Sequence, residues 1–94
     1  MTFKDILKEA NTVLNLNIDW ENTVNDSNYN NLLDCAKLRF NVFYGGSVDE
    51  DTIVKDVHHL IVYNGIIAEW AFINGHLSIW KEYETKYNRA MRGL

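Results

Sequence analysis

The sequence contains no proline and only five glycines, so helices can run without interruption and glycine is the main residue that can end them. Its single cysteine, Cys35, excludes an internal disulfide and favours a reducing compartment. The most apolar stretch, residues 60–73, is interrupted by Asn64 and Glu69 and is too short to cross a bilayer. Acidic residues follow soon after Met1, which argues against a signal peptide and predicts assembly in a cytoplasm.

What is present suits one folded domain spanning residues 1–94. Apolar residues make up 47% and aromatic residues 13%, which argues against a disordered chain. The net charge is −4, which argues against a general nucleic-acid binder. The charge is uneven, because residues 76–94 carry four cations against two acids, a net of +2, and the first 75 residues hold −6. This asymmetry predicts a basic end that faces a partner.

A first helix is predicted at the N-terminus. Thr2 can cap it, with Asp5 in the position of the capping-box acid, and apolar residues then keep helical spacing to Leu14. The following stretch, residues 15–27, is polar and rich in Asn and Asp. We expect it to form a connecting loop.

A second helix is predicted from a cap at Asp26 or Ser27 to Phe43. The glycine pair at 45–46 provides a stop signal. Residues 47–51 then resemble the capped, acidic start of a third helix, where negative charge meets the positive end of the helix dipole.

Residues 57–83 admit two interpretations. The Asn-Gly pairs at 64–65 and 74–75 separate apolar runs, which is typical of a three-stranded meander. Helical spacing through residues 51–73 and the segment Ala68–Ala71 favour helix instead. A helix would place Gly65 in its interior, at a cost of about 1 kcal/mol unless close packing requires glycine there.

The last helix is predicted to be amphipathic. At about 100° per residue, aromatic residues fall on one arc and basic residues on the opposite arc. The aromatic arc, expected to face the bundle or a neighbouring subunit, contains Trp80, Tyr83 and Tyr87. The basic arc, expected to be exposed, contains Lys81, Lys86, Arg89 and Arg92.

No recognisable catalytic or cofactor motif is present. Cys35 lies mid-helix without a glycine-rich elbow, which favours a buried structural cysteine over a nucleophile. His58 and His59 are adjacent, so on a helix they point about 100° apart and do not easily share a metal with Asp56. The acidic run at 49–51 lacks the glycine and closing Glu of a calcium loop. We therefore expect a protein that binds other proteins, is not an enzyme, and needs no metal or cofactor.

Three segments form a pattern. They are Tyr63-x-Gly65-Ile66-Ile67-Ala68-Glu69-Trp70-Ala71-Phe72-Ile73-x-Gly75, then Trp80-x-x-x-x-x-Lys86-Tyr87-x-x-Ala90, and the earlier stretch Asn31-Leu32-Leu33-Asp34-Cys35-Ala36-Lys37-Leu38. The first two resemble the last two helices of head–tail connector (adaptor) proteins of tailed bacteriophages, and the third is similar to the family's second helix. Longer members carry an inserted β-rich segment between the middle helices, whereas this chain passes directly from Phe43 through the glycine pair to Ser47.

The resemblance implies a short, all-α bundle of about four helices, with a long central helix and an amphipathic C-terminal helix. It implies a subunit of a homo-oligomeric ring in the virion neck, which binds the portal and other head–tail joining or tail proteins. Portal docking would involve the C-terminal helix, through Trp80, Tyr83, Lys86, Tyr87, Arg89 and Arg92. No membrane and no sequence-specific nucleic acid are expected as partners. The alternative is a small phage-encoded regulator or inhibitor that binds a host protein.

Overall fold

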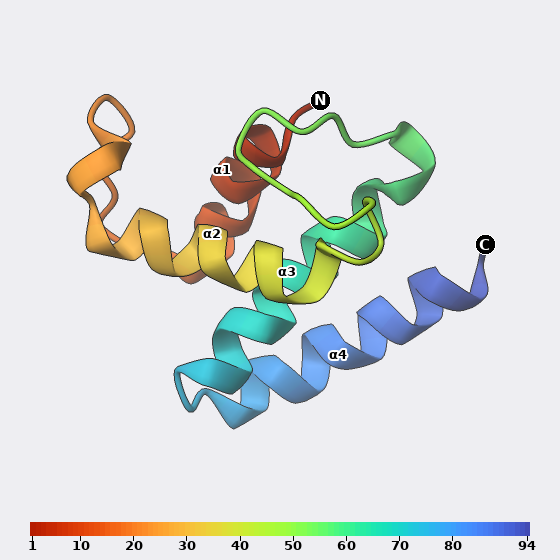
Figure 1. Ribbon diagram of the computed structural model, residues 1–94. Helices are drawn as coiled ribbons and strands as arrows, with labels where there is room; N and C mark the ends of the chain where they lie inside the picture. Colours follow the sequence, from red (N-terminus) through yellow and green to blue (C-terminus); the bar gives the residue numbers. More distant parts are fainter.

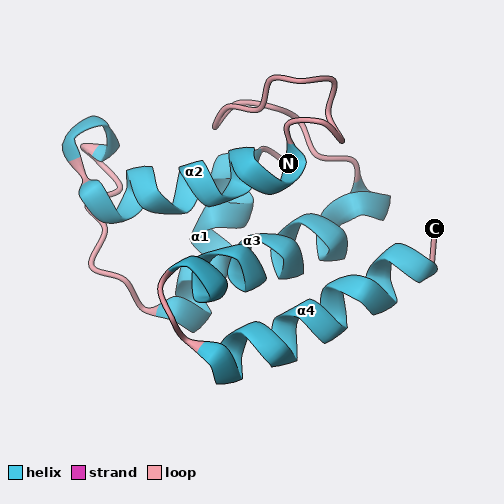
Figure 2. Ribbon diagram, turned by 60° about the horizontal axis from the view of Figure 1, so that its bottom comes forward, coloured by secondary structure: helices cyan, strands magenta, loops and turns pink.

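A computed structural model describes all residues, 1–94, and contains helices only (Figures 1 and 2). In chain order the elements are α1 (Phe3–Leu14), η1 (Thr23–Asn25), α2 (Ser27–Phe40), η2 (Asp56–His58), α3 (His59–Ile73) and α4 (Leu77–Arg92), where η marks a short 3₁₀ turn. The only β-type pairing is an isolated bridge between Thr2 and Ile53. The predicted all-α class is confirmed, and the meander is not formed. No helix has the length and apolar character needed to span a bilayer.

The predicted caps of α1 and α2 are present. The Asp5 amide donates to Thr2 Oγ1 at 3.2 Å, and the Thr2 amide donates to Asp5 Oδ2 at 2.9 Å, which completes the capping box. These hydrogen bonds with Thr2 lower the pKa of Asp5. At the start of α2, the Tyr29 amide donates to Asp26 Oδ1 at 2.9 Å.

Helix α2 ends at Phe40, earlier than the predicted end at Phe43. Phe40 is the last residue of this stretch in the core, whereas Val42 is 93% exposed. The next residues form turns in which Gly45 and Gly46 take positive φ values of 85° and 102°. The chain therefore leaves the core at Phe40, and α2 ends there, before the glycine pair is reached.

The predicted helix start at residues 47–51 is wrong. This segment is not helical, and it covers the beginning of α1. The Lys4 amide donates to the Glu50 carbonyl at 3.0 Å, and the Phe3 amide donates to the Thr52 carbonyl at 3.0 Å. The Glu50 carboxylate also accepts the hydroxyl hydrogen bond of Tyr29. The segment does not become a helix because the carbonyls of Glu50 and the following Thr52 satisfy amides in the first turn of α1, which have no partner within that helix.

Helix α3 is the centre of the fold, and α1, α2 and α4 each pack against it (Figure 1). Nine of its 15 residues are buried. These are Ile61, Val62, Asn64, Gly65, Ile66, Ile67, Ala68, Trp70 and Ala71. A tight turn through Gly75, whose φ is +78°, reverses the chain so that α4 runs antiparallel along α3 (Figures 1 and 2). The Asn-Gly pairs therefore lie within a helix and between helices, not in hairpins.

Gly65 is required in α3 because α2 approaches closely there. A Cβ atom on Gly65 would lie 2.5 Å from Phe40 Cζ and 3.0 Å from Arg39 Cδ. Contact at 2.5 Å is far inside van der Waals separation, so no other residue fits unless the Phe40 ring or α2 itself moves. Close packing thus explains the glycine inside a buried helix.

Gly65→Ala should therefore destabilise the fold, although alanine has the higher helix propensity. We expect a net loss of roughly 1–3 kcal/mol of unfolding free energy in urea titrations, since overpacking outweighs the propensity gain of about 1 kcal/mol. In the double variant with Phe40→Leu, the loss should be smaller than the sum of the two single losses. Strict additivity would mean that the Phe40 ring does not set the requirement for glycine.

Candidate partner-binding surface on the C-terminal helix

Helix α4 packs along α3 and touches no other helix through its backbone. Tyr83 is its one buried residue, at 8% exposure, and Trp80 and Tyr87 are half-buried. The Trp80 ring lies 5.7 Å from the exposed ring of Phe72, and the Tyr87 ring lies 6.3 Å from that of Phe40. The aromatic arc of the sequence thus faces α3 and the end of α2.

The basic residues of α4 divide into two sets. Lys86, Arg89, Arg92 and Lys81 are all exposed. Lys81 and Arg92 lie roughly opposite Tyr83 at 100° per residue, on the solvent face. Lys86 and Arg89 instead border a depression beside α3.

The sequence predicted Lys86 on the face opposite the aromatic arc, and this prediction is wrong. Residues three apart on a helix are neighbours, so the Lys86 Nζ atom lies 4.5 Å from the centre of the Tyr83 ring. The same atom donates to Glu82 at 2.9 Å, and this hydrogen bond raises the pKa of Lys86. Lys86 therefore sits at the border of the two arcs.

A depression runs between the start of α3 and the end of α4, and we call it the α3–α4 groove. Its first part has a volume of about 510 Å³ and is lined by Leu60, Tyr63, Asn64, Lys86, Arg89 and Ala90. Its second part, about 400 Å³, is lined by Asp56, Val57, Leu60, Ile61, Ala90, Gly93 and Leu94. Leu60 and Ala90 belong to both parts, so the groove is continuous.

Asn64 supplies the polar group at the base of the groove. The residue is only 6% exposed, yet its side-chain amide makes no hydrogen bond within the chain. Every fully enclosed side-chain nitrogen or oxygen has a partner, so the amide of Asn64 must still reach the groove. An accessible amide with no partner in the chain can offer both a donor and an acceptor to a bound group.

Arg39, near the end of α2, links α4 to α2 and α3. Its Nε atom bonds Glu69 Oε1 of α3 at 3.1 Å, and its Nη1 atom bonds Glu84 of α4 at 3.0 Å. The guanidinium also stacks on Tyr87, 4.7 Å from the ring centre. The Arg39 side chain is 14% exposed, so three helices meet in a largely shielded ionic cluster. Sequence reasoning missed it, because its members come from separate helices with no local spacing in common.

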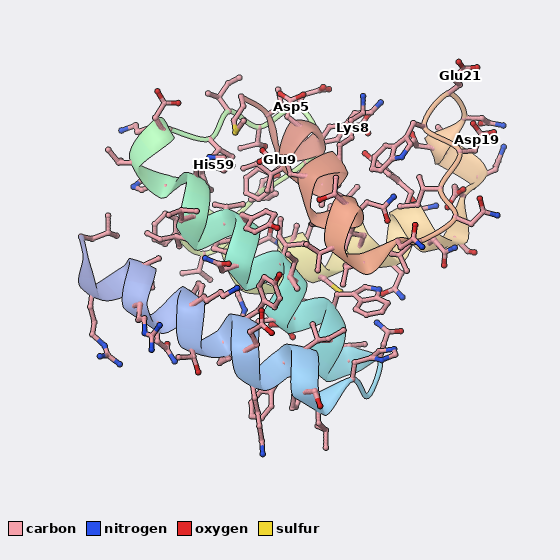
Figure 3. All side chains as sticks on the ribbon, turned by 180° about the vertical axis from the view of Figure 1, so that it is seen from behind. Asp5, Lys8, Glu9, Asp19, Glu21 and His59 are labelled. Atoms are coloured by element: carbon pink, nitrogen blue, oxygen red, sulfur yellow. The ribbon has the colours of Figure 1, made fainter.

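The residues considered for catalysis or metal binding do not converge on one site. Cys35 is in the core, and burial raises the pKa of its thiol to about 12. The His59 Nε2 atom pairs with Glu9 at 3.0 Å (Figure 3), whereas His58 contacts the Tyr44 hydroxyl at 3.3 Å. The two histidines therefore have different partners. No three His, Cys, Asp or Glu side chains come close enough together to hold a metal ion.

Comparison with known proteins identifies no relative of this chain. No protein-family model matches the sequence, and no curated protein or solved structure is significantly similar to it. The resemblance to connector proteins is thus a hypothesis based on residues 31–38, 63–75 and 80–90.

Arg39→Met should weaken the attachment of α4. The variant keeps most of the side-chain volume but leaves Glu69 and Glu84 without their cation, in sites only partly open to water. We expect a loss of about 2–3 kcal/mol in unfolding free energy, between the values for exposed and fully buried pairs. The matched control, Lys86→Met, breaks an exposed pair with Glu82 and should hardly change the melting temperature. Equal effects of the two substitutions would contradict a central role for Arg39.

Cys35 should react slowly with Ellman's reagent in the native protein. The thiol is buried, and with a pKa of about 12 it forms almost no thiolate near neutral pH. Labelling should therefore follow opening of the fold and should accelerate sharply in unfolding concentrations of urea. Rapid labelling of the folded protein would contradict the core location and revive the nucleophile hypothesis.

Proposed function

We propose that this chain is a head–tail connector subunit, which binds the portal and joins the DNA-filled head to the tail as part of a homo-oligomeric ring. The observation that carries the proposal is the placement of α4. It is an amphipathic helix, tied to α2 by the Arg39–Glu84 ion pair, with a basic solvent face on a chain whose other residues carry a net negative charge. Complementary charge steers and orients protein association, so this face suits an acidic protein surface.

The residues that carry the resemblance support the proposal because several of them hold α3 and α4 together or position them against α2. Gly65 permits the close approach of α2, and Gly75 forms the turn between α3 and α4. Glu69 and Tyr87 both contact Arg39. The shared pattern therefore describes a paired α3–α4 unit rather than isolated positions, and this unit would be what the connectors have in common.

The proposed docking face is tested by Lys81→Glu combined with Arg92→Glu. Exposed charges contribute little to folding, so the double variant should keep its helical circular-dichroism spectrum and its melting temperature. Binding to the portal protein of the same phage, measured by sedimentation of the mixed proteins, should weaken by at least about tenfold, and the binding of the unmodified chain should fall with added salt.

The matched control is Lys8→Glu combined with Lys55→Glu, which makes the same change in net charge at exposed sites outside α4. It should bind the portal almost normally. If both variants bind equally well, the basic face of α4 is not the docking site. If the unmodified chain ignores the portal and binds a host protein as a monomer or dimer, the regulator hypothesis replaces the connector.

A further inference from the structure

The chain carries a projecting acidic loop and a basic, partly apolar groove on different sides of the molecule. We propose that the 19–24 loop of one copy inserts into the α3–α4 groove of the next copy, so that copies associate head to tail. The inference rests on the proposed connector function only in expecting that this association closes into a ring. The association itself is a property of the purified chain.

The groove has the composition of an unfilled binding site. Asn64 offers an amide without a partner, and Arg89 offers a cation that makes no ion pair within the chain. The apolar side chains of Val57, Leu60 and Leu94 are 70%, 62% and 63% exposed. An aliphatic side chain next to a carboxylate would cover the apolar part and satisfy the polar part at once.

The 19–24 loop presents that combination. Val24 is 82% exposed, and Asp19 and Glu21 are exposed beside it in sequence. Figure 3 shows Asp19 and Glu21 on the loop that projects from the body of the molecule. In Figure 1 this loop, drawn in orange before α2, lies on the opposite side from the C-terminus that ends the groove. A loop and a groove so far apart in one molecule can meet only between molecules.

The loop is also held in shape before any contact forms. The Asp19 amide donates to Asp26 at 2.8 Å, and the Asn30 side chain donates to the Val24 carbonyl at 3.1 Å. The Trp20 ring packs edge-on against Tyr29, with centroids 5.8 Å apart. A preorganised loop loses little conformational entropy on binding, which favours association through a small surface.

The charges around the groove indicate how the loop would enter. Lys86 is already paired with Glu82, and Asp56 lines the far end. A carboxylate is therefore attracted by Arg89 and repelled by Asp56, while the charge of Lys86 is already balanced by Glu82. We assign Glu21 to Arg89 and Asn64, and Val24 to the apolar surface of Leu60. Because the two surfaces differ, the interface is heterologous, and it builds a closed ring or an open filament.

The experiment uses two variants, Val24→Asp in the loop and Leu60→Asp in the groove. Both residues are exposed, so each variant should fold normally by circular dichroism. Sedimentation velocity of the unmodified chain, up to about 1 mM, should show association beyond the dimer. Each variant alone should associate at least about tenfold more weakly.

Mixing the variants gives the sharpest result. The Leu60→Asp chain keeps its loop and the Val24→Asp chain keeps its groove, so one contact forms and the second cannot. The equimolar mixture should stop at a one-to-one dimer. The control, Val42→Asp, changes a residue that is 93% exposed and belongs to neither surface, and it should associate like the unmodified chain.

Several outcomes would overturn the inference. They are a chain that stays monomeric at about 1 mM, a mixture that forms no dimer, and a loss of association in Leu60→Asp but not in Val24→Asp. The last result would mean that the groove binds another segment or another protein. If the unmodified chain self-associates in this way but does not bind the portal, the proposed function is wrong and this interface stands, so the two proposals fail separately.

Discussion

The burial of α3 is the constraint on which the rest of this structure depends. A helix that is apolar on nearly all sides cannot stay in water, and it must be covered from several directions at once. In a chain of 94 residues, only three other helices are available to do so. Helices α1, α2 and α4 each take one side of α3, and they make few contacts with one another. Their positions therefore follow from the surface of α3.

Two local solutions make this arrangement possible. Gly65 removes the side chain that would keep Phe40 away, so α2 can lie close to α3. Arg39, the residue before Phe40, then crosses to Glu69 and Glu84 and ties α4 to both helices. The apolar packing of α4 includes only one buried side chain, Tyr83, while Ile79, Trp80, Tyr87 and Ala90 are partly buried. The close packing of Phe40 against Gly65 and the ion pairs of the neighbouring Arg39 thus both fix the position of α2 against α3.

Local signals in the sequence predicted the parts of the fold that depend on neighbouring residues. The capping box at Thr2, the cap at Asp26 and the amphipathic spacing of α4 each involve positions within one turn or one helix. The errors arose where distant segments compete for the same groups. Residues 47–51 have the composition of a helix start, but the carbonyls of Glu50 and the following Thr52 accept hydrogen bonds from amides of α1, and no local pattern reveals that. The Arg39 cluster and the groove were missed for the same reason, although Asn64 in an apolar run was a visible signal.

The small size of the domain explains why covering the α3–α4 groove would matter for stability. Only 22 of 94 residues are buried, and small domains gain little stability from such a core. Val57 lies in η2 and Leu60 in the first turn of α3, where α4 is ending and leaves both uncovered. Covering this surface with a neighbouring copy adds to stability by mass action, because the neighbour binds the folded chain and not the unfolded one. The solvent face of α4, with Lys81 and Arg92, points away from the groove and stays free for another partner. A subunit built this way can gain stability from its neighbours and still present a charged face to a second protein.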